Sequence, residues 1–90
     1  MKVEIQTDDI KKEVIATYIR IKEGEVARTE EIGEENFIDL DKDGCLLGIE
    51  ILNFDEAPGL LSSLADKFNL PALREIVCEE ITKIFATGKT

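Results

Sequence analysis

Residues 37–52 read FIDLDKDGCLLGIEIL, and this stretch decides the fold, because two alternating apolar runs flank a polar turn. Side chains of a β-strand alternate between its two faces. In the second run, one face carries Cys45, Leu47, Ile49 and Ile51, and the other carries Leu46, Gly48, Glu50 and Leu52. The intervening Asp41-Lys42-Asp43-Gly44 has the composition of a tight turn. The stretch therefore predicts a β-hairpin.

The segment before this hairpin has the same β character. Residues 3–7 alternate between apolar and polar, and residues 14–22 are rich in β-branched side chains, which favour strands over helices. Gly24 can adopt a positive φ at little cost, so we expect a short hairpin that joins 14–22 to 25–32. Residues 33–36 form a polar break before the next strand.

After Phe54 the apolar spacing changes from two residues to three or four, which is typical of helices. We expect Asp55 to cap the first helix, Pro58 to lie in its first turn, and Pro71 to separate it from a second helix. The apolar stripe of the first helix is Leu60, Leu61, Leu64, Ala65 and Phe68. That of the second is Leu73, Ile76, Val77, Ile81, Ile84 and Phe85, and Gly88 marks its expected end.

Strands followed by helices predict an α+β fold, with an antiparallel β-meander of four or five strands and two C-terminal helices packed on one face. The 90 residues suffice for a single domain, with the sheet in residues 1–53 and a helical segment in 54–90. Either the second helix packs entirely on this sheet, or part of its stripe mediates self-association into a homo-oligomer.

The chain is acidic, with 20 Asp and Glu against 11 Lys and Arg, a formal net charge of −9. Residues 23–56 hold twelve acids and only two bases, a net charge of −10, whereas both ends are nearly neutral. Such a charge disfavours nucleic-acid and anionic membrane partners, because both are bound through Lys and Arg. It favours a basic protein partner.

Composition also excludes several classes of enzyme. The chain has no histidine, so a His general base, a Ser–His triad and a His-ligated zinc are excluded. No apolar run resembles a signal peptide or a membrane span, which predicts a cytoplasmic protein. Cys45 and Cys78 are then expected to be reduced, small, buried side chains. We expect no enzymatic activity.

One motif suggests a metal. Asp39, Asp41, Asp43, Gly44 and Glu50 fit the calcium-loop pattern D-x-[DN]-x-[DN]-G-x₅-E at every specified position. An EF-hand needs a helix on each side of its loop, whereas the flanking residues have strand patterns. We therefore interpret the motif as a solvated hairpin turn, with no cofactor. A weak Ca²⁺ or Mg²⁺ site on Asp39, Asp41, Asp43 and Glu50 stays open as an alternative.

Two further sets of residues have possible chemistry. Glu50 lies within an apolar strand, where burial would raise its pKa and suit it to acid–base catalysis; an exposed position on the sheet is the simpler expectation. Tyr18 and Arg20 share one face of a strand, where they either bind a ligand or peptide or make a cross-strand packing contact.

Four blocks of sequence together resemble a known family. They are Tyr18-Ile19-Arg20-Ile21, Gly24-Glu25-Val26-Ala27-Arg28-Thr29-Glu30, Ile38-Asp39-Leu40-Asp41-Lys42-Asp43-Gly44 and Leu47-Gly48-Ile49-Glu50-Ile51-Leu52. In order and spacing they are similar to the small prokaryotic proteins grouped as domain of unknown function family 2283, over about residues 14–53. The resemblance implies a β-rich core with the D-x-D-x-D-G stretch between two strands. It implies no activity and no catalytic residues.

The function hypothesis that follows is a non-enzymatic interaction protein, an antitoxin-like or accessory module whose acidic segment meets a basic partner. Self-association through the second helix would accompany it. The alternative is a divalent-cation or small-ligand binding module that uses the carboxylates of Asp39, Asp41, Asp43 and Glu50.

Overall fold

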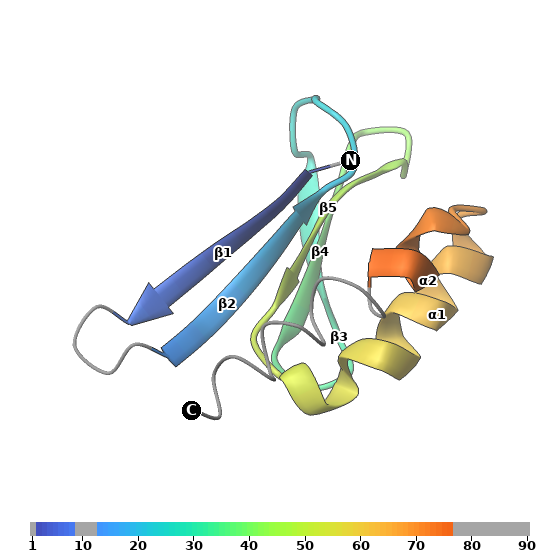
Figure 1. The fold of residues 1–90 in the computed structure, drawn as a ribbon. Helices are drawn as coiled ribbons and strands as arrows, with labels where there is room; N and C mark the ends of the chain where they lie inside the picture. Colours follow the sequence, from blue (N-terminus) through green and yellow to red (C-terminus); the bar gives the residue numbers. More distant parts are fainter. Residues whose placement is uncertain (1, 9–12, 77–90) are drawn as a thin grey trace.

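The computed structural model describes residues 2–8 and 13–76 (Figure 1). It contains five strands, a short 3₁₀ helix and two α-helices. The strands are β1 (Lys2–Asp8), β2 (Glu13–Arg20), β3 (Arg28–Ile32), β4 (Asn36–Leu40) and β5 (Leu46–Ile51). They are followed by η1 (Phe54–Glu56), α1 (Ala57–Lys67) and α2 (Ala72–Ile76).

The strands form one antiparallel sheet in the order β1-β2-β5-β4-β3. Figure 1 shows α1 and α2 together on one side of this sheet. The predicted α+β class, an antiparallel sheet followed by two helices on one face, is confirmed. The hairpin predicted around residues 41–44 is confirmed as β4 and β5.

The strand order departs from a simple meander at one connection. The expected hairpin around Gly24 is wrong, because β2 pairs with β5 and β3 pairs with β4. Residues 21–27 instead cross the end of the sheet. The backbone N–H groups of Ile21 and Lys22 both donate to the carbonyl of Leu47, at 2.8 and 3.3 Å, and Ala27 donates to Leu40 at 2.8 Å. The meander is therefore limited to β3, β4 and β5.

The core lies between the sheet and the helices. Ile19 of β2 and Ile49 and Ile51 of the central strand β5 are completely buried, in one cluster with Leu61 and Leu73 of the helices. Ile38, Leu40, Leu46, Ala57, Leu64 and Ala65 complete this cluster. Full burial of a leucine or isoleucine side chain contributes about 1.5–3 kcal/mol, so this apolar layer is the main source of stability. It also fixes which face of the sheet is left for function.

A bulge in β5 corrects the predicted faces of that strand. Leu40 pairs with Leu46 and Asp39 pairs with Gly48, so Leu47 is an extra residue without a partner on β4. Because a bulge shifts the alternation by one residue, Leu46 joins the core beside Ile49. Leu47, expected on the face of Ile49, is buried elsewhere, close beneath Gly24.

The helices begin slightly differently from the prediction. The chain enters α1 through η1, and the N-cap of α1 is Glu56 rather than Asp55, without a capping bond from its side chain. The Glu56 carboxylate instead accepts the backbone N–H of Glu34 at 2.8 Å. Pro58 lies in the first turn of α1 and Pro71 directly precedes α2, both as predicted. The predicted residues Val77, Cys78, Ile81, Ile84, Phe85 and Gly88 lie outside the described residues, and with them most of the stripe that was expected to mediate self-association.

Candidate functional site

The candidate site is the face of the sheet opposite the helices, which we call the open face. Its side chains form two rows that cross all five strands. The first row is Glu4, Tyr18, Glu50, Phe37 and Glu31, and the second is Lys2, Arg20, Gly48, Asp39 and Thr29. In the part of the chain that the structure describes, no helix packs on this face.

The side chains of Tyr18 on β2 and Thr29 on β3 both form hydrogen bonds with Asp39 on β4. The Tyr18 hydroxyl donates to Asp39 Oδ2 at 2.7 Å, and the Thr29 hydroxyl donates to Asp39 Oδ1 at 2.6 Å. Hydrogen bonds to an ionised acceptor are shorter and stronger than neutral ones. The contacts tie β2, β4 and β3 together on the open face, although β2 and β4 are not neighbours.

Gly48 makes the longer of these connections possible. It lies on β5 between Arg20 and Asp39, and the Tyr18 side chain passes directly over it. A Cβ at this position would lie 1.8 Å from the Tyr18 hydroxyl oxygen. Because Gly48 has no side chain, the Tyr18 side chain can cross β5 at this position and its hydroxyl can reach Asp39.

The environment of Tyr18 favours its protonated form. Its pKa is raised to about 12, first by burial of the ring and then by the hydrogen bond to Asp39 and the negative charge of that carboxylate. Arg20, whose guanidinium lies 5.6 Å from the centroid of the Tyr18 ring, lowers the pKa by a smaller amount. At neutral pH this tyrosine is a hydrogen-bond donor and a poor base.

Charge is unevenly distributed over the open face. On β1 and β2, Glu4 receives two cations, with Lys2 Nζ at 3.7 Å and Arg20 at 3.8 Å. On the other three strands, the described chain supplies no cation to Glu31, Asp39 or Glu50. We call these three residues the acidic end of the open face. The predicted shared face of Tyr18 and Arg20 is confirmed, and Glu50 is half-buried there rather than in the core.

The turn that carries the metal motif is organised by Asp41. Its Oδ1 accepts the backbone N–H groups of Asp43 and Cys45, both at 2.9 Å. These bonds lower the pKa of the Asp41 carboxyl, with the bond from Cys45 contributing most. Gly44 has φ +82°, a conformation that glycine adopts readily. The predicted strand–turn–strand arrangement around the motif is confirmed.

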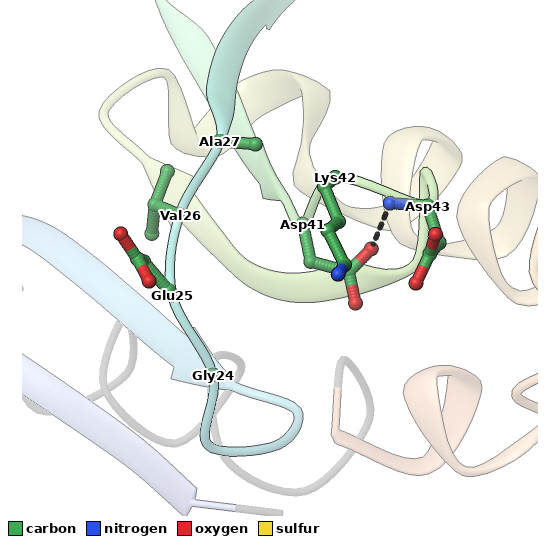
Figure 2. A pocket seen from close by; sticks show the side chains of 7 residues that line it. All are labelled: Gly24, Glu25, Val26, Ala27, Asp41, Lys42 and Asp43. Atoms are coloured by element: carbon green, nitrogen blue, oxygen red, sulfur yellow. Dashed lines mark hydrogen bonds between the residues drawn. The ribbon is translucent and has the colours of Figure 1, made fainter.

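A shallow hollow lies beside this turn. It has a volume of about 370 Å³ and is lined by Gly24, Glu25, Val26, Ala27, Asp41, Lys42 and Asp43. Figure 2 shows the crossing segment on one side and the turn on the other, with the Asp41 carboxylate bonded to the Asp43 N–H. The hollow is open to solvent, and its two walls are the crossing segment, residues 24–27, and the turn, residues 41–43.

The four carboxylates of the metal motif lie in different parts of the structure. Asp39 and Glu50 project from the open face, Asp41 closes its own turn, and Asp43 is exposed. Among residues 2–8 and 13–76, no group of three or more Asp, Glu or Cys side chains is arranged to hold a metal ion. A cation site on these four residues therefore stays a prediction, and the described residues supply no cluster of ligands for it.

Cys45 differs from its prediction, because its thiol is exposed. It follows Gly44 in the turn, where its backbone is held by Asp41, so its side chain is not drawn into the core. Cys78, its possible partner, lies outside the described residues.

Sequence reasoning missed the contact of Tyr18 with Asp39, whose members are 21 positions apart. This contact can be inferred only from the register in which the strands pair. Once β2 and β4 are both paired with β5, Tyr18 and Asp39 become diagonal neighbours across Gly48. A lone glycine within an apolar strand often marks such a close approach, but it does not say what approaches.

Among the described helices, none is long and apolar enough to cross a membrane. No curated protein and no solved structure shows a significant match to the chain. The model of the family described as "Protein of unknown function (DUF2283)" matches residues 7–54, more than half of the chain. The matched range contains β2 to β5 and hence most of the open face. The chain therefore belongs to the DUF2283 family of proteins of unknown function.

Proposed function

We propose that this chain is a non-enzymatic protein-interaction module that binds a basic partner with the acidic end of its open face. The observation that carries the proposal is the convergence of Glu31, Asp39 and Glu50 on one side of the sheet, without a cation from the described residues. An antitoxin-like or accessory role is one form that such binding can take.

The structure of the sheet supports this choice of surface. Antiparallel sheets often bury one face and leave the other in water, so exposure alone does not indicate binding. The open face is distinguished by the separation of its charges. Lys2 and Arg20 pair with Glu4 on β1 and β2, whereas the acids Glu50, Asp39 and Glu31 lie together on β5, β4 and β3. A surface with one sign of charge attracts partners of the opposite sign and accelerates their association.

The side chains of the open face also suit binding better than catalysis. Tyr18 holds its proton to about pH 12, and both oxygens of Asp39 already accept hydroxyl hydrogen bonds. Tyr18 is therefore a poor general base near neutral pH, and Asp39 has a structural role in the network. The network orients the side chains of Tyr18, Thr29 and Asp39 before a partner binds, and such preorganisation lowers the entropic cost of binding.

The proposal is tested by co-purification of proteins from the source cells, with a pair of variants matched in charge. The face variant is Glu31→Gln/Glu50→Gln, and the control is Asp55→Asn/Glu75→Gln, which removes two exposed acids away from the open face. We expect Lys- and Arg-rich proteins to be retained at low salt and released at roughly 0.5 M salt, where exposed charges are screened. The face variant should retain less of them than the control.

Two results would overturn the proposal. One is equal retention of the same proteins by the face variant and the control. The other is that no basic protein is retained by the unaltered chain at low salt. In either case the acidic end would have only the general solubilising role of surface charge.

A further inference from the structure

The open face contains a second aromatic side chain, Phe37, which is half-buried in the middle of the acidic end. It pairs with Glu50 on β5 and with Glu31 on β3, so a carboxylate stands on each side of it in the same row. Directly opposed residues of antiparallel strands have their Cβ atoms about 4.5–5.5 Å apart. Asp39 is two positions further along β4, on the same face.

The β1–β2 half of the open face contains a comparable group, an aromatic ring beside a carboxylate, and there an arginine side chain lies against it. There the aromatic residue is Tyr18, its neighbours in the row are Glu4 and Glu50, and Arg20 completes the group. The Arg20 guanidinium lies 5.6 Å from the ring centroid and 3.8 Å from the Glu4 carboxylate. A guanidinium is attracted to the face of an aromatic ring and bonds to carboxylates with its planar set of N–H groups.

Phe37 has the same surroundings without the cation. Among the described residues, Arg20 is bound to Glu4 and Arg28 to Glu30, and no basic side chain contacts Glu31 or Glu50. The Glu50 carboxylate has no hydrogen-bond partner in the described chain, whereas the Glu31 carboxylate uses one oxygen to accept the N–H of Glu35 at 3.1 Å. Three of the four carboxylate oxygens of Glu31 and Glu50 therefore have no donor among the described residues.

We propose that Phe37, Glu31 and Glu50 form a seat for an arginine side chain of the basic partner. This inference rests on the proposed function and names the group that is recognised. The guanidinium lies on the Phe37 ring and donates N–H groups to the flanking carboxylates. Arg20 provides the related arrangement, with its guanidinium 5.6 Å from the Tyr18 ring centroid and paired with the Glu4 carboxylate at 3.8 Å. Asp39 adds negative charge, but Tyr18 and Thr29 already occupy its oxygens. Arginine is favoured over lysine, because the ammonium of lysine is a compact, strongly hydrated charge without a planar face.

The test uses two short blocked peptides, acetyl-Gly-Arg-Gly-amide and acetyl-Gly-Lys-Gly-amide, titrated into the whole chain and followed by NMR. We expect the arginine peptide to bind more tightly, and its largest shifts to fall on the Phe37 ring and on the amides of Glu31 and Glu50. Phe37→Leu should weaken arginine binding by roughly five-fold, the size of a partly exposed cation–π contact. Phe37→Tyr, which keeps a ring, should bind nearly as the unaltered chain does.

Phe68→Leu is the matched control, because Phe68 is also a half-buried phenylalanine but packs against the core on the helical side. Its binding should be unchanged. Phe37→Met gives a second ring-free variant of similar volume in case the leucine variant does not fold.

The possible failures are distinct. If both ring-free variants bind the arginine peptide as the unaltered chain does, while Glu31→Gln/Glu50→Gln loses it, the arginine seat is overturned and the acidic interaction surface survives. The seat is also overturned if the shifts centre on the turn at residues 41–44, or if the lysine peptide binds equally well. If neither the ring-free variants nor the glutamate variant changes binding, the seat and the proposed function both fail.

Discussion

The Tyr18 hydroxyl group occupies the space that a side chain at Gly48 would need. An ideal Cβ on Gly48 would lie 1.8 Å from the hydroxyl oxygen and 2.3 Å from Cζ of the ring. Neither distance is compatible with van der Waals contact, so a larger residue at position 48 and the present position of Tyr18 exclude each other. The hydrogen bond from Tyr18 to Asp39 depends on that vacancy.

Gly48→Ala should therefore displace Tyr18 from Asp39. We expect the free energy of unfolding to fall by about 1–3 kcal/mol, as is usual for an added methyl group in a filled space. Denaturant unfolding measures this loss. In a Tyr18→Ala background the clash is absent, so Gly48→Ala should then cost much less. Additive effects of the two substitutions would show that the clash is not the cause.

Titration of Tyr18 should be displaced to high pH. Ultraviolet absorbance of the folded protein should give a midpoint near 12, since burial and Asp39 both oppose ionisation. Because the pKa of the folded state exceeds the ordinary value of 10.0, the folded state holds the proton more tightly. The resulting stabilisation is complete below about pH 10 and is lost as the pH rises towards 12. Asp39→Asn should lower the midpoint, and an unchanged midpoint would contradict the assigned role of Asp39.

Asp41 should protect two specific amides from hydrogen exchange. Its Oδ1 accepts the N–H groups of Asp43 and Cys45, so Asp41→Ala should accelerate exchange at both positions. Asp41→Asn keeps an acceptor oxygen and should accelerate it less. Since the pKa of Asp41 is lowered on folding, its stabilising effect is present above the ordinary carboxyl pKa of 3.8 and is lost as the pH falls below it. Exchange at the two amides should follow that loss.

Calcium and magnesium should not bind the D-x-D-x-D-G turn with useful affinity. Asp39 is occupied by two hydroxyl donors, Asp41 by two backbone donors, and Glu50 is on the open face two residues beyond Gly48. Calorimetry at about millimolar metal should show no saturable heat, since tight sites gather six or more oxygens. A saturable heat that disappears in Asp41→Asn/Asp43→Asn would instead establish the cation site.

Cys45 should react with thiol reagents while the protein is folded. Its side chain is exposed in the turn after Gly44, so modification needs no unfolding step. A chromogenic disulfide reagent should therefore label this position in native buffer, and mass spectrometry of the digested product identifies which cysteine reacted. Protection of Cys45 that is relieved only by denaturant would contradict the exposed position.

The sequence predicted the elements of the fold better than their connections. Alternation from Phe37 to Leu52 and the Pro58 and Pro71 signals are local, and local patterns determine strand and helix type. The pairing of β2 with β5 is not local, because residues 21–27 occupy the position of the expected hairpin and bond to Leu47 and Leu40 instead. Hydrophobic alternation does not specify which strand becomes a neighbour.

The candidate site was predicted only in fragments. The sequence placed Tyr18 beside Arg20 and identified Asp39 and Glu50 as notable acids, but it grouped the acids by a linear metal motif. In the structure Asp41 and Asp43 lie in the turn, whereas Asp39 and Glu50 lie on the open face. Only the lateral register, which joins Glu50 to Phe37 and Phe37 to Glu31, shows them as parts of one surface.

The central position of β5 makes one strand pairing of the sheet non-local. The pairs β1 with β2, β3 with β4, and β4 with β5 each join strands that are close in the chain. Among the described strands, β5 is the last along the chain, and its pairing with β2 connects the β1-β2 hairpin to the β3-β4-β5 meander. Bringing β5 beside β2 closes a loop that includes β3 and β4, a step with a higher entropic cost than any of the local pairs. Ile49 and Ile51 meet Ile19 in the core through that pairing, so the two rows of the open face exist only once β5 lies against β2.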